Sequence, residues 1–306
     1  MELALITVKQ VIVLFILIFA GFVCVKTKAV KMEGKKAFSD LLLYLIVPAM
    51  VINSYMMEFN AEILQNLLKA FGLSILLLFI GLLVTMVLTA KHKSPDLPIM
   101  RFACIFSNAA YMGFPLIQAL FGSEGLLYAS AFVTVYNILL WTVGYGIVSK
   151  KVRAKEVWRT IFTNPVLISV VAGLLIYLCQ IPVPDIIKQP ISLIGNMNTP
   201  LSMFITGMII AGSDIKGLVY NKNIWYIILV RQLVIPAVCF GVFSLFHVTG
   251  MAAQVVLLLE ACPSAAITSV FAVQFQYDEN LAAGAVVITT FLSILTLPVC
   301  AMLLTV

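Results

Sequence analysis

The sequence predicts an all-α polytopic membrane protein with ten transmembrane helices in two inverted repeats of five helices each. Three observations predict this fold class: an apolar composition, ten windows long enough to cross a bilayer, and prolines at matched places in the two halves. Of the 306 residues, 62% are hydrophobic and only 10% are charged. This is far more apolar surface than a soluble fold of this length needs.

Stretches of roughly 20 predominantly apolar residues, the length that crosses a bilayer, follow one another along the chain. They fall near residues 5–25, 38–57, 66–90, 99–122, 126–149, 165–181, 191–212, 224–247, 251–275 and 281–304. No long polar segment remains between these spans, so the sequence leaves no soluble domain for catalysis or nucleic-acid binding. We therefore expect a lipid bilayer around the protein, no nucleic-acid partner and no enzyme activity.

Positive charge gathers on alternate loops. The loops after the first, third, fifth and seventh spans carry 15 of the 19 Lys and Arg residues, and Arg231 lies inside the eighth span. The opposite side has only Lys9, Lys69 and Lys188. Because cytoplasmic loops concentrate Lys and Arg, we expect both termini to lie outside the cell (cytoplasmic) membrane.

Cysteine and histidine give no sign of a metal or catalytic centre. All six cysteines fall within spans without C-x-x-C spacing, and the two histidines are isolated from each other. Such residues form neither a metal cluster nor a nucleophile–base pair. We expect no metal site, no catalytic residue and no cofactor.

Matched proline spacing indicates an internal duplication. Pro48 precedes Pro115 by 67 residues, and Pro200 precedes Pro263 by 63. A second copy of a five-span unit must be upside down in the bilayer, as in many secondary transporters. We therefore expect a first repeat over residues 1–150, a basic cytoplasmic linker over 151–164 and a second, inverted repeat over 165–306.

The fourth and ninth spans are both interrupted. Residues 102–120, FACIFSNAAYMGFPLIQAL, and residues 255–271, VVLLLEACPSAAITSVF, carry helix-breaking residues within apolar runs. Backbone groups freed in hydrocarbon need protein or water partners, and paired broken helices are the best sequence indication of a transporter's substrate site. The candidate substrate-binding residues are Asn108, Gly113, Pro115, Pro263, Ser264 and Thr268.

The breaks do not by themselves fix the charge of the substrate. A half-helix that restarts after Pro115 or Pro263 points N–H groups at the break and attracts a carboxylate, whereas the carbonyls at the other helix ends suit a cation. The Asn108 amide can donate to a carboxylate or accept from a cation-bound water.

Glu260, three residues before Pro263, is an ionisable group at membrane depth, where such groups are costly and usually functional. As a coupling residue it would bind a proton or a cation. As a structural residue it would pair with Arg231. The residues leave both interpretations open.

The run from Asn108 to Leu116, NAAYMGFPL, resembles the N-x-G-[FY]-[LM]-G-x-P-L signature of the auxin efflux carrier family, bacterial and plant carriers of organic anions. Ala110 stands where that family usually has Gly. The second half, Pro263 followed by Ala272 and then by residues 278–298, DENLAAGAVVITTFLSILTLP, resembles the family's second crossing helix and closing span. Ile267 replaces the polar residue often found four positions after this proline, with Thr268 beside it.

The resemblance implies a scaffold domain of spans 1, 2, 6 and 7 and a transport domain whose spans 4 and 9 cross at their prolines. It also implies an elevator-like movement. The short linker favours a bacterial carrier of small carboxylates such as malate or malonate over a plant exporter of auxin-like acids. Two points stay open: whether transport is coupled to H⁺, Na⁺ or the membrane potential, and whether the protein assembles as a homodimer.

Two alternatives remain beside an organic-anion carrier. A sodium-coupled organic-anion symporter resembling the bile-acid symporter family is favoured by Glu260. A non-transporting membrane sensor would share the same spans without moving a substrate.

Overall fold

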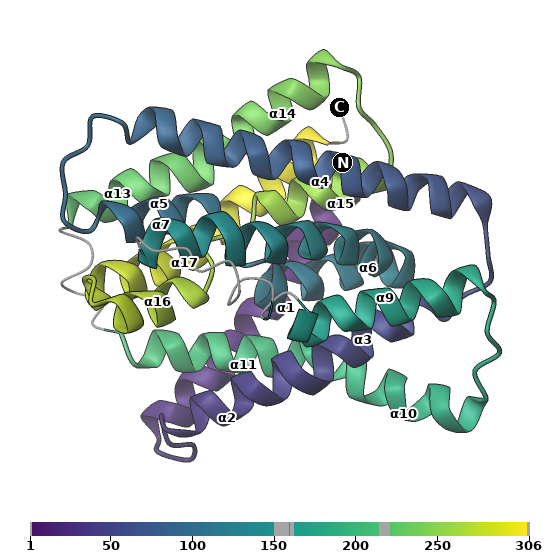
Figure 1. The fold of residues 1–306 in the computed structure, drawn as a ribbon. Helices are drawn as coiled ribbons and strands as arrows, with labels where there is room; N and C mark the ends of the chain where they lie inside the picture. The colour runs from purple at the N-terminus through teal and green to yellow at the C-terminus, as the bar shows by residue number, and fades with distance from the viewer. Residues whose placement is uncertain (1, 150–158, 160–161, 214–220, 305–306) are drawn as a thin grey trace.

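The computed structural model of the chain describes residues 2–149, 159, 162–213 and 221–304 (Figure 1). Within these ranges every regular element is a helix and no strand is present. Most of the linker expected at 151–164 lies outside the described residues, and so does Lys216 in the loop after the expected seventh span. The all-α class is confirmed.

The first part of the chain, in order, contains α1 (Glu2–Lys26), α2 (Gly34–Leu41), η1 (Leu42–Ile46), α3 (Val47–Tyr55), α4 (Ala61–Leu88), α5 (Leu97–Ile105), η2 (Ala109–Gly113), α6 (Phe114–Leu139), η3 (Leu140–Gly144) and α7 (Tyr145–Ser149), where η marks a π-helical turn. The second part contains α9 (Pro165–Leu178), α10 (Asp185–Asn196), α11 (Asn198–Ala211), α13 (Lys222–Ile228), η4 (Leu229–Val234), α14 (Ile235–Leu245), α15 (Met251–Glu260), α16 (Ile267–Phe275) and α17 (Glu279–Leu303).

In the described part of the chain, seven helical segments are long and apolar enough to cross a membrane, compared with the ten windows expected. They are Leu5–Lys26, Gly34–Tyr55, Ala61–Leu88, Ala109–Ser149, Asp185–Ala211, Lys222–Leu245 and Glu279–Leu303. Two shorter apolar helices are Pro165–Leu178 and Met251–Glu260. Three expected spans account for the difference: most of the fourth joins the fifth in Ala109–Ser149, the sixth is the 14-residue helix Pro165–Leu178, and the ninth is divided into α15 and α16. In addition, Ala109–Ser149 contains a non-helical Gly122 with φ 61° and ψ −148°.

Side-chain caps and prolines set where several helices begin. The Asn60 side chain accepts hydrogen bonds from the first backbone N–H groups of α4, and Asn164 and Asp278 do the same for α9 and α17. Pro165 occupies the first turn of α9. Each cap satisfies N–H groups that have no partner within the helix.

A π-helical turn directly precedes three prolines. The turns η1, η2 and η4 end just before α3, α6 and α14, whose first turns contain Pro48, Pro115 and Pro236. A proline ring removes one backbone donor and crowds the carbonyl four residues earlier, and a widened turn accommodates it. Three membrane segments are therefore irregular in their middle, where an uninterrupted α-helix would be expected.

The helices gather in two groups. One group joins α1, α2, α3, α9, α10 and α11, with α1 packed along α11 and α3 packed between α9 and α10. The other joins α4, α5, α6 and α13 to α17, with α15 packed against α4 and α6. Figure 1 shows α2, α3, α10 and α11 on the lower side of the molecule and α4, α13 and α14 on the upper side.

Glycines bring α1 and α11 into close contact. A Cβ atom on Gly207 of α11 would lie 2.1 Å from the backbone oxygen of Ile18, and one on Gly21 of α1 would lie 2.3 Å from that of Phe204. Small residues let membrane helices approach and pack in this way. The first group is therefore held by backbone-to-backbone packing that larger side chains would disrupt.

Candidate functional site

The two interrupted segments meet and satisfy each other's backbone. After α5 ends at Ile105, the Asn108 N–H donates to the Pro263 carbonyl at 2.7 Å. The Ala265 N–H donates to the Phe106 carbonyl at 2.9 Å, and Ser107 and Ser264 form an isolated antiparallel bridge. Non-helical backbone at membrane depth needs such protein partners. We call this meeting point, residues 106–108 and 261–266, the crossing.

The first break lies earlier in the chain than its proline. The chain leaves the helical conformation at Phe106, which has φ −98° and ψ 118°, and Pro115 lies in the first turn of α6. Proline is tolerated there because its missing N–H would have no helical partner. Pro263, by contrast, lies inside the second break. Its carbonyl accepts the bond from Asn108.

Gly113 allows η2 to approach α15 closely. A Cβ atom at this position would lie 2.5 Å from Cδ2 of Leu259 on α15. Gly113 therefore occupies a packing contact between the two interrupted segments, and its N–H donates to the Asn108 carbonyl at 3.1 Å in the π-helical pattern.

The polar candidate residues fall into two kinds. Ser264 is bound on both sides, since its hydroxyl donates to the Ala103 carbonyl at 2.9 Å and its N–H donates to Oγ1 of Thr289 at 3.0 Å. Asn108 and Thr268 are buried, yet among the described residues Nδ2 of Asn108 and Oγ1 of Thr268 have no hydrogen-bond partner. Oγ of Ser107, beside Asn108, also has none. These three residues therefore carry buried polar atoms without a protein partner among the described residues.

Arg231 of η4 covers the C-terminal ends of both broken helices. Its Nη1 donates to the carbonyls of Cys104 and Ile105 at the end of α5, each at 3.1 Å, and its Nε donates to the carbonyl of Cys262 just after α15, also at 3.1 Å. Helix C-termini carry unpaired carbonyls and partial negative charge. The guanidinium neutralises both ends at once.

Glu260 forms a buried ion pair with the same guanidinium. Its Oε1 lies 3.1 Å from Nη1 of Arg231, and both side chains are 0% exposed. The second carboxylate oxygen, Oε2, has no partner among the described residues. Of the two interpretations left open by the sequence, the structure contains the ion pair; a role in coupling stays a prediction.

Gln232 fixes the position of η4 beside the crossing. Its Nε2 donates to the Thr289 carbonyl at 3.0 Å, and its Oε1 accepts from Oγ1 of Thr296 at 2.8 Å. Thr289 also accepts the Ser264 N–H. α17 therefore connects η4, which carries Arg231, to the crossing. The position of the guanidinium is fixed both by its own hydrogen bonds and by the contacts of η4 with α17.

Helix C-termini and helix N-termini lie on opposite sides of the two breaks. The C-terminal ends of α5 and α15 meet Arg231, while η2 and α16 begin on the other side of each break, at Ala109 and Ile267. The first N–H groups of a helix have no partner within it and favour negative charge. Asn108 precedes one of these N-terminal ends, and Thr268 belongs to the other.

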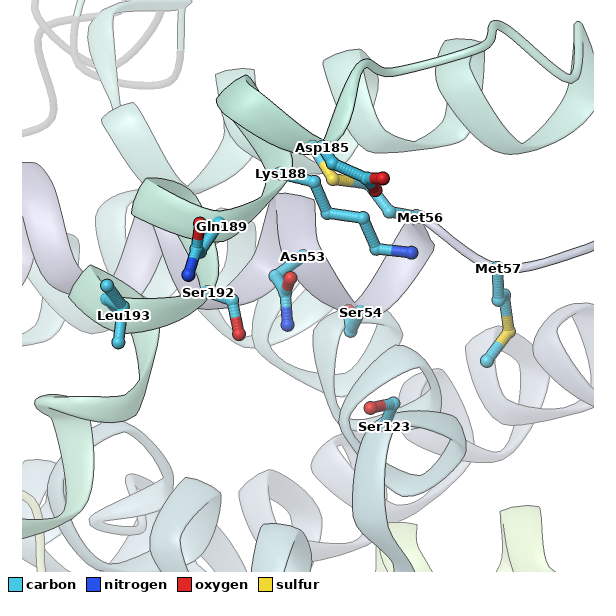
Figure 2. A pocket seen from close by; sticks show the side chains of 10 residues that line it. All are labelled: Asn53, Ser54, Met56, Met57, Ser123, Asp185, Lys188, Gln189, Ser192 and Leu193. Carbon is cyan, nitrogen blue, oxygen red and sulfur yellow. The ribbon is translucent and has the colours of Figure 1, made fainter.

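A second polar region is a pocket of about 610 Å³ between α3 and α10. Its lining residues are Asn53, Ser54, Met56, Met57, Ser123, Asp185, Lys188, Gln189, Ser192 and Leu193. Figure 2 shows Lys188 extending from α10 toward Met56 at the end of α3. The sequence analysis did not select these residues for a site. The signal that it missed is the recurrence of Asp185, Lys188, Gln189 and Ser192 at helical spacing just before and at the start of the seventh span.

Comparisons with known proteins agree with the family resemblance. Residues 6–301 match the membrane transport protein family. The chain is 24% identical over 305 residues to the uncharacterized transporter MJ1031 of Methanocaldococcus jannaschii, covering 96% of this chain and 97% of that protein. It is 23% identical over 201 residues to an uncharacterized transporter of Methanothermobacter thermautotrophicus, covering 65% of each. The chain therefore belongs to the membrane transport protein family, that of the auxin efflux carriers, and is a multi-pass membrane transporter.

Proposed function

We propose that the protein is a secondary transporter of small organic anions, carboxylates such as malate or malonate or auxin-like acids. The observation that carries this proposal is the unpartnered, buried Asn108 amide beside a helix N-terminus at the crossing. Leaving a buried donor unsatisfied costs about 1–3 kcal/mol, so such a group is typically kept for a ligand or an ordered water. A carboxylate would accept from Nδ2 and from the N-terminal N–H groups.

The position of Arg231 supports an anion over a cation. Carbonyls at helix C-termini are the groups that coordinate sodium in transporters with broken helices. Here the carbonyls of Cys104, Ile105 and Cys262 accept from the guanidinium, which occupies the place a cation would take. The sodium-coupled alternative keeps one supporting observation, the unpartnered Oε2 of Glu260. Because a free carboxylate oxygen can bind a proton or Na⁺, these are the coupling ions to test first, together with the membrane potential.

The mechanism we infer is an elevator-like alternating access. The two helix groups support it, because the crossing and Arg231 belong to one group while α1, α3 and α11 belong to the other. We further propose ten spans in two inverted repeats, residues 1–150 and 165–306, joined by the cytoplasmic linker 151–164. In this arrangement α5, η2 and the part of α6 before Gly122 would form the fourth span, and the rest of α6 with η3 and α7 the fifth. α15 with α16 would form the ninth, and both termini would face outward across the cytoplasmic membrane.

Uptake into liposomes tests the proposal. Purified protein reconstituted into liposomes should accumulate radiolabelled malate, malonate or indole-3-acetate above the level of protein-free liposomes. The Asn108→Ala variant is the matched control for the site. A thermal-shift screen against mono- and dicarboxylates gives a second readout, since a ligand that binds only the folded state raises apparent stability. Binding without accumulation under any ion gradient would contradict transport of these anions and favour the sensor alternative.

A further inference from the structure

Both helix groups contribute walls to the pocket between α3 and α10. α3 and α10 belong to one group, and α6, which contributes Ser123, belongs to the other. Ser123 directly follows Gly122, whose φ of 61° and ψ of −148° form a combination that glycine adopts far more readily than other residues. The pocket therefore lies where the bend in α6 meets the end of α3 and the beginning of α10.

Two hydrogen bonds join the groups beside the pocket. One turn after Ser192 on α10, Oδ1 of Asn196 accepts from Nε2 of Gln118 on α6 at 3.4 Å. The hydroxyls of Tyr55 at the end of α3 and Ser130 on α6 share a hydrogen bond of 2.6 Å. None of the residues that line the pocket belongs to the crossing. The pocket is therefore a site of its own.

Lys188 gives the pocket a positive charge that no side chain neutralises. Its amine has no ion pair and no hydrogen bond in the part of the chain that the structure describes. Figure 2 shows its side chain reaching from α10 toward the end of α3. The amides of Asn53 and Gln189 and the hydroxyls of Ser123 and Ser192 line the same pocket. An ammonium group with amide and hydroxyl donors around it suits a carboxylate.

The rest of the lining restricts which carboxylate fits. Asp185 lies three residues before Lys188, and residues three apart are neighbours on a helix, so a second negative charge on a ligand would meet its carboxylate. Met56, Met57 and Leu193 offer apolar surface, and methionine adapts to irregular ligands. The volume of about 610 Å³ is typical of small-molecule sites. The lining therefore matches one carboxylate with an apolar body better than a dicarboxylate.

We propose that this pocket is a second anion site, separate from the crossing, and that it binds an aliphatic monocarboxylate. The carboxylate accepts from Lys188, the aliphatic chain lies against Met56, Met57 and Leu193, and Asp185 disfavours a second carboxylate. Because the walls come from both helix groups, the ligand stabilises the arrangement in which the groups meet. A role of this site in transport rests on the proposed function, whereas the binding of a monocarboxylate does not.

Equilibrium dialysis of radiolabelled butyrate, hexanoate and malonate against the detergent-solubilised protein tests the site, with protein-free micelles as the background. The protein carries Asn108→Ala, which removes the amide at the crossing. Hexanoate should bind more tightly than butyrate, by up to about fourfold for each added CH₂ group. Lys188→Gln should weaken hexanoate binding about tenfold. Lys69→Gln is the matched control, because its Nζ donates to the Thr249 carbonyl at 2.7 Å and does not line the pocket. Asp185→Asn should strengthen malonate binding about threefold by removing a repulsion.

The outcomes separate this inference from the proposed function. Hexanoate binding that falls in Lys188→Gln but not in Lys69→Gln supports the site. No hexanoate binding above background, or equal binding in these two variants, overturns the site even if the parent protein accumulates carboxylates. Malonate that binds as tightly as hexanoate, or that gains no more than butyrate from Asp185→Asn, overturns the preference for a monocarboxylate. Absence of uptake by the parent protein, with Lys188-dependent binding intact, contradicts the proposed function alone. If Asn108→Ala misfolds, the same comparison of Lys188→Gln with Lys69→Gln in the parent protein decides the question.

Discussion

Replacing Arg231 with methionine should strongly destabilise the protein. Methionine has a similar length but no charge, so Arg231→Met leaves the Glu260 carboxylate buried without its partner. Breaking a buried ion pair by removing one partner costs about 3–5 kcal/mol. The carbonyls of Cys104, Ile105 and Cys262 lose their donor as well. We therefore expect the free energy of unfolding to fall by at least that amount.

Equilibrium unfolding in mixed micelles, at increasing mole fraction of sodium dodecyl sulfate, measures this loss. Arg101→Met is the matched control, because Arg101 is only partly buried and its Nε donates to one neutral acceptor, Oγ1 of Thr89, at 2.8 Å. A typical hydrogen bond contributes about 0.5–1.5 kcal/mol. The double variant Arg231→Met/Glu260→Met should be more stable than Arg231→Met, since it buries no unpaired charge. A loss in Arg231→Met no larger than in Arg101→Met would refute the reasoning.

Three further predictions concern the crossing. Asn108→Ala should weaken substrate binding by about 1.5–3 kcal/mol, roughly ten- to a hundredfold in the dissociation constant, while folding is kept. Glu260→Gln keeps the shape of the side chain but removes the charge, so it should retain substrate binding, flatten the pH or sodium dependence of uptake and lower stability by leaving Arg231 without a counter-ion. Ser107→Cys combined with Ser264→Cys should form a disulfide, because residues opposite each other in an antiparallel pair have Cα atoms about 4.5–5.5 Å apart.

Each of these predictions has an outcome that would contradict it. Unchanged uptake kinetics in Asn108→Ala would remove that amide from the site. For Glu260→Gln, normal stability together with an unaltered pH and sodium profile would contradict both the coupling and the ion-pair interpretations. The single variants Ser107→Cys and Ser264→Cys control for background oxidation, and a double variant that never cross-links, even with a short bifunctional reagent, would contradict the meeting of the two breaks.

Sequence reasoning located the interruptions but not their geometry. Asn, Gly and Pro within apolar runs predict broken spans, and both segments are broken. The position of the first break was harder to predict from the sequence, because a proline such as Pro115 starts a helix as readily as it ends one. The chain leaves the helix at Phe106, nine positions before that proline.

The role of Arg231 could be predicted only in part. A single Arg inside an apolar span indicates a buried partner, and Glu260 was a reasonable candidate. That the guanidinium also donates to carbonyls at the end of α5 depends on a contact between residues 127 apart in sequence, Arg231 and Cys104. No local pattern identifies which backbone carbonyls a distant side chain will reach. The pocket at Lys188 was missed for a similar reason, because its residues come from three segments.

The Arg231–Glu260 pair has an electrical consequence for the proposed movement. Among the described residues, these are the only charged side chains that are fully buried, and their formal charges cancel. Moving one elementary charge across the membrane potential is worth about 2.3 kcal/mol per 100 mV. If the crossing changes its depth in the bilayer, the pair contributes no net gating charge to that step. The voltage dependence of the loaded carrier would then report the valence of the bound anion and its coupling ion, and the empty carrier would return at a rate nearly independent of voltage.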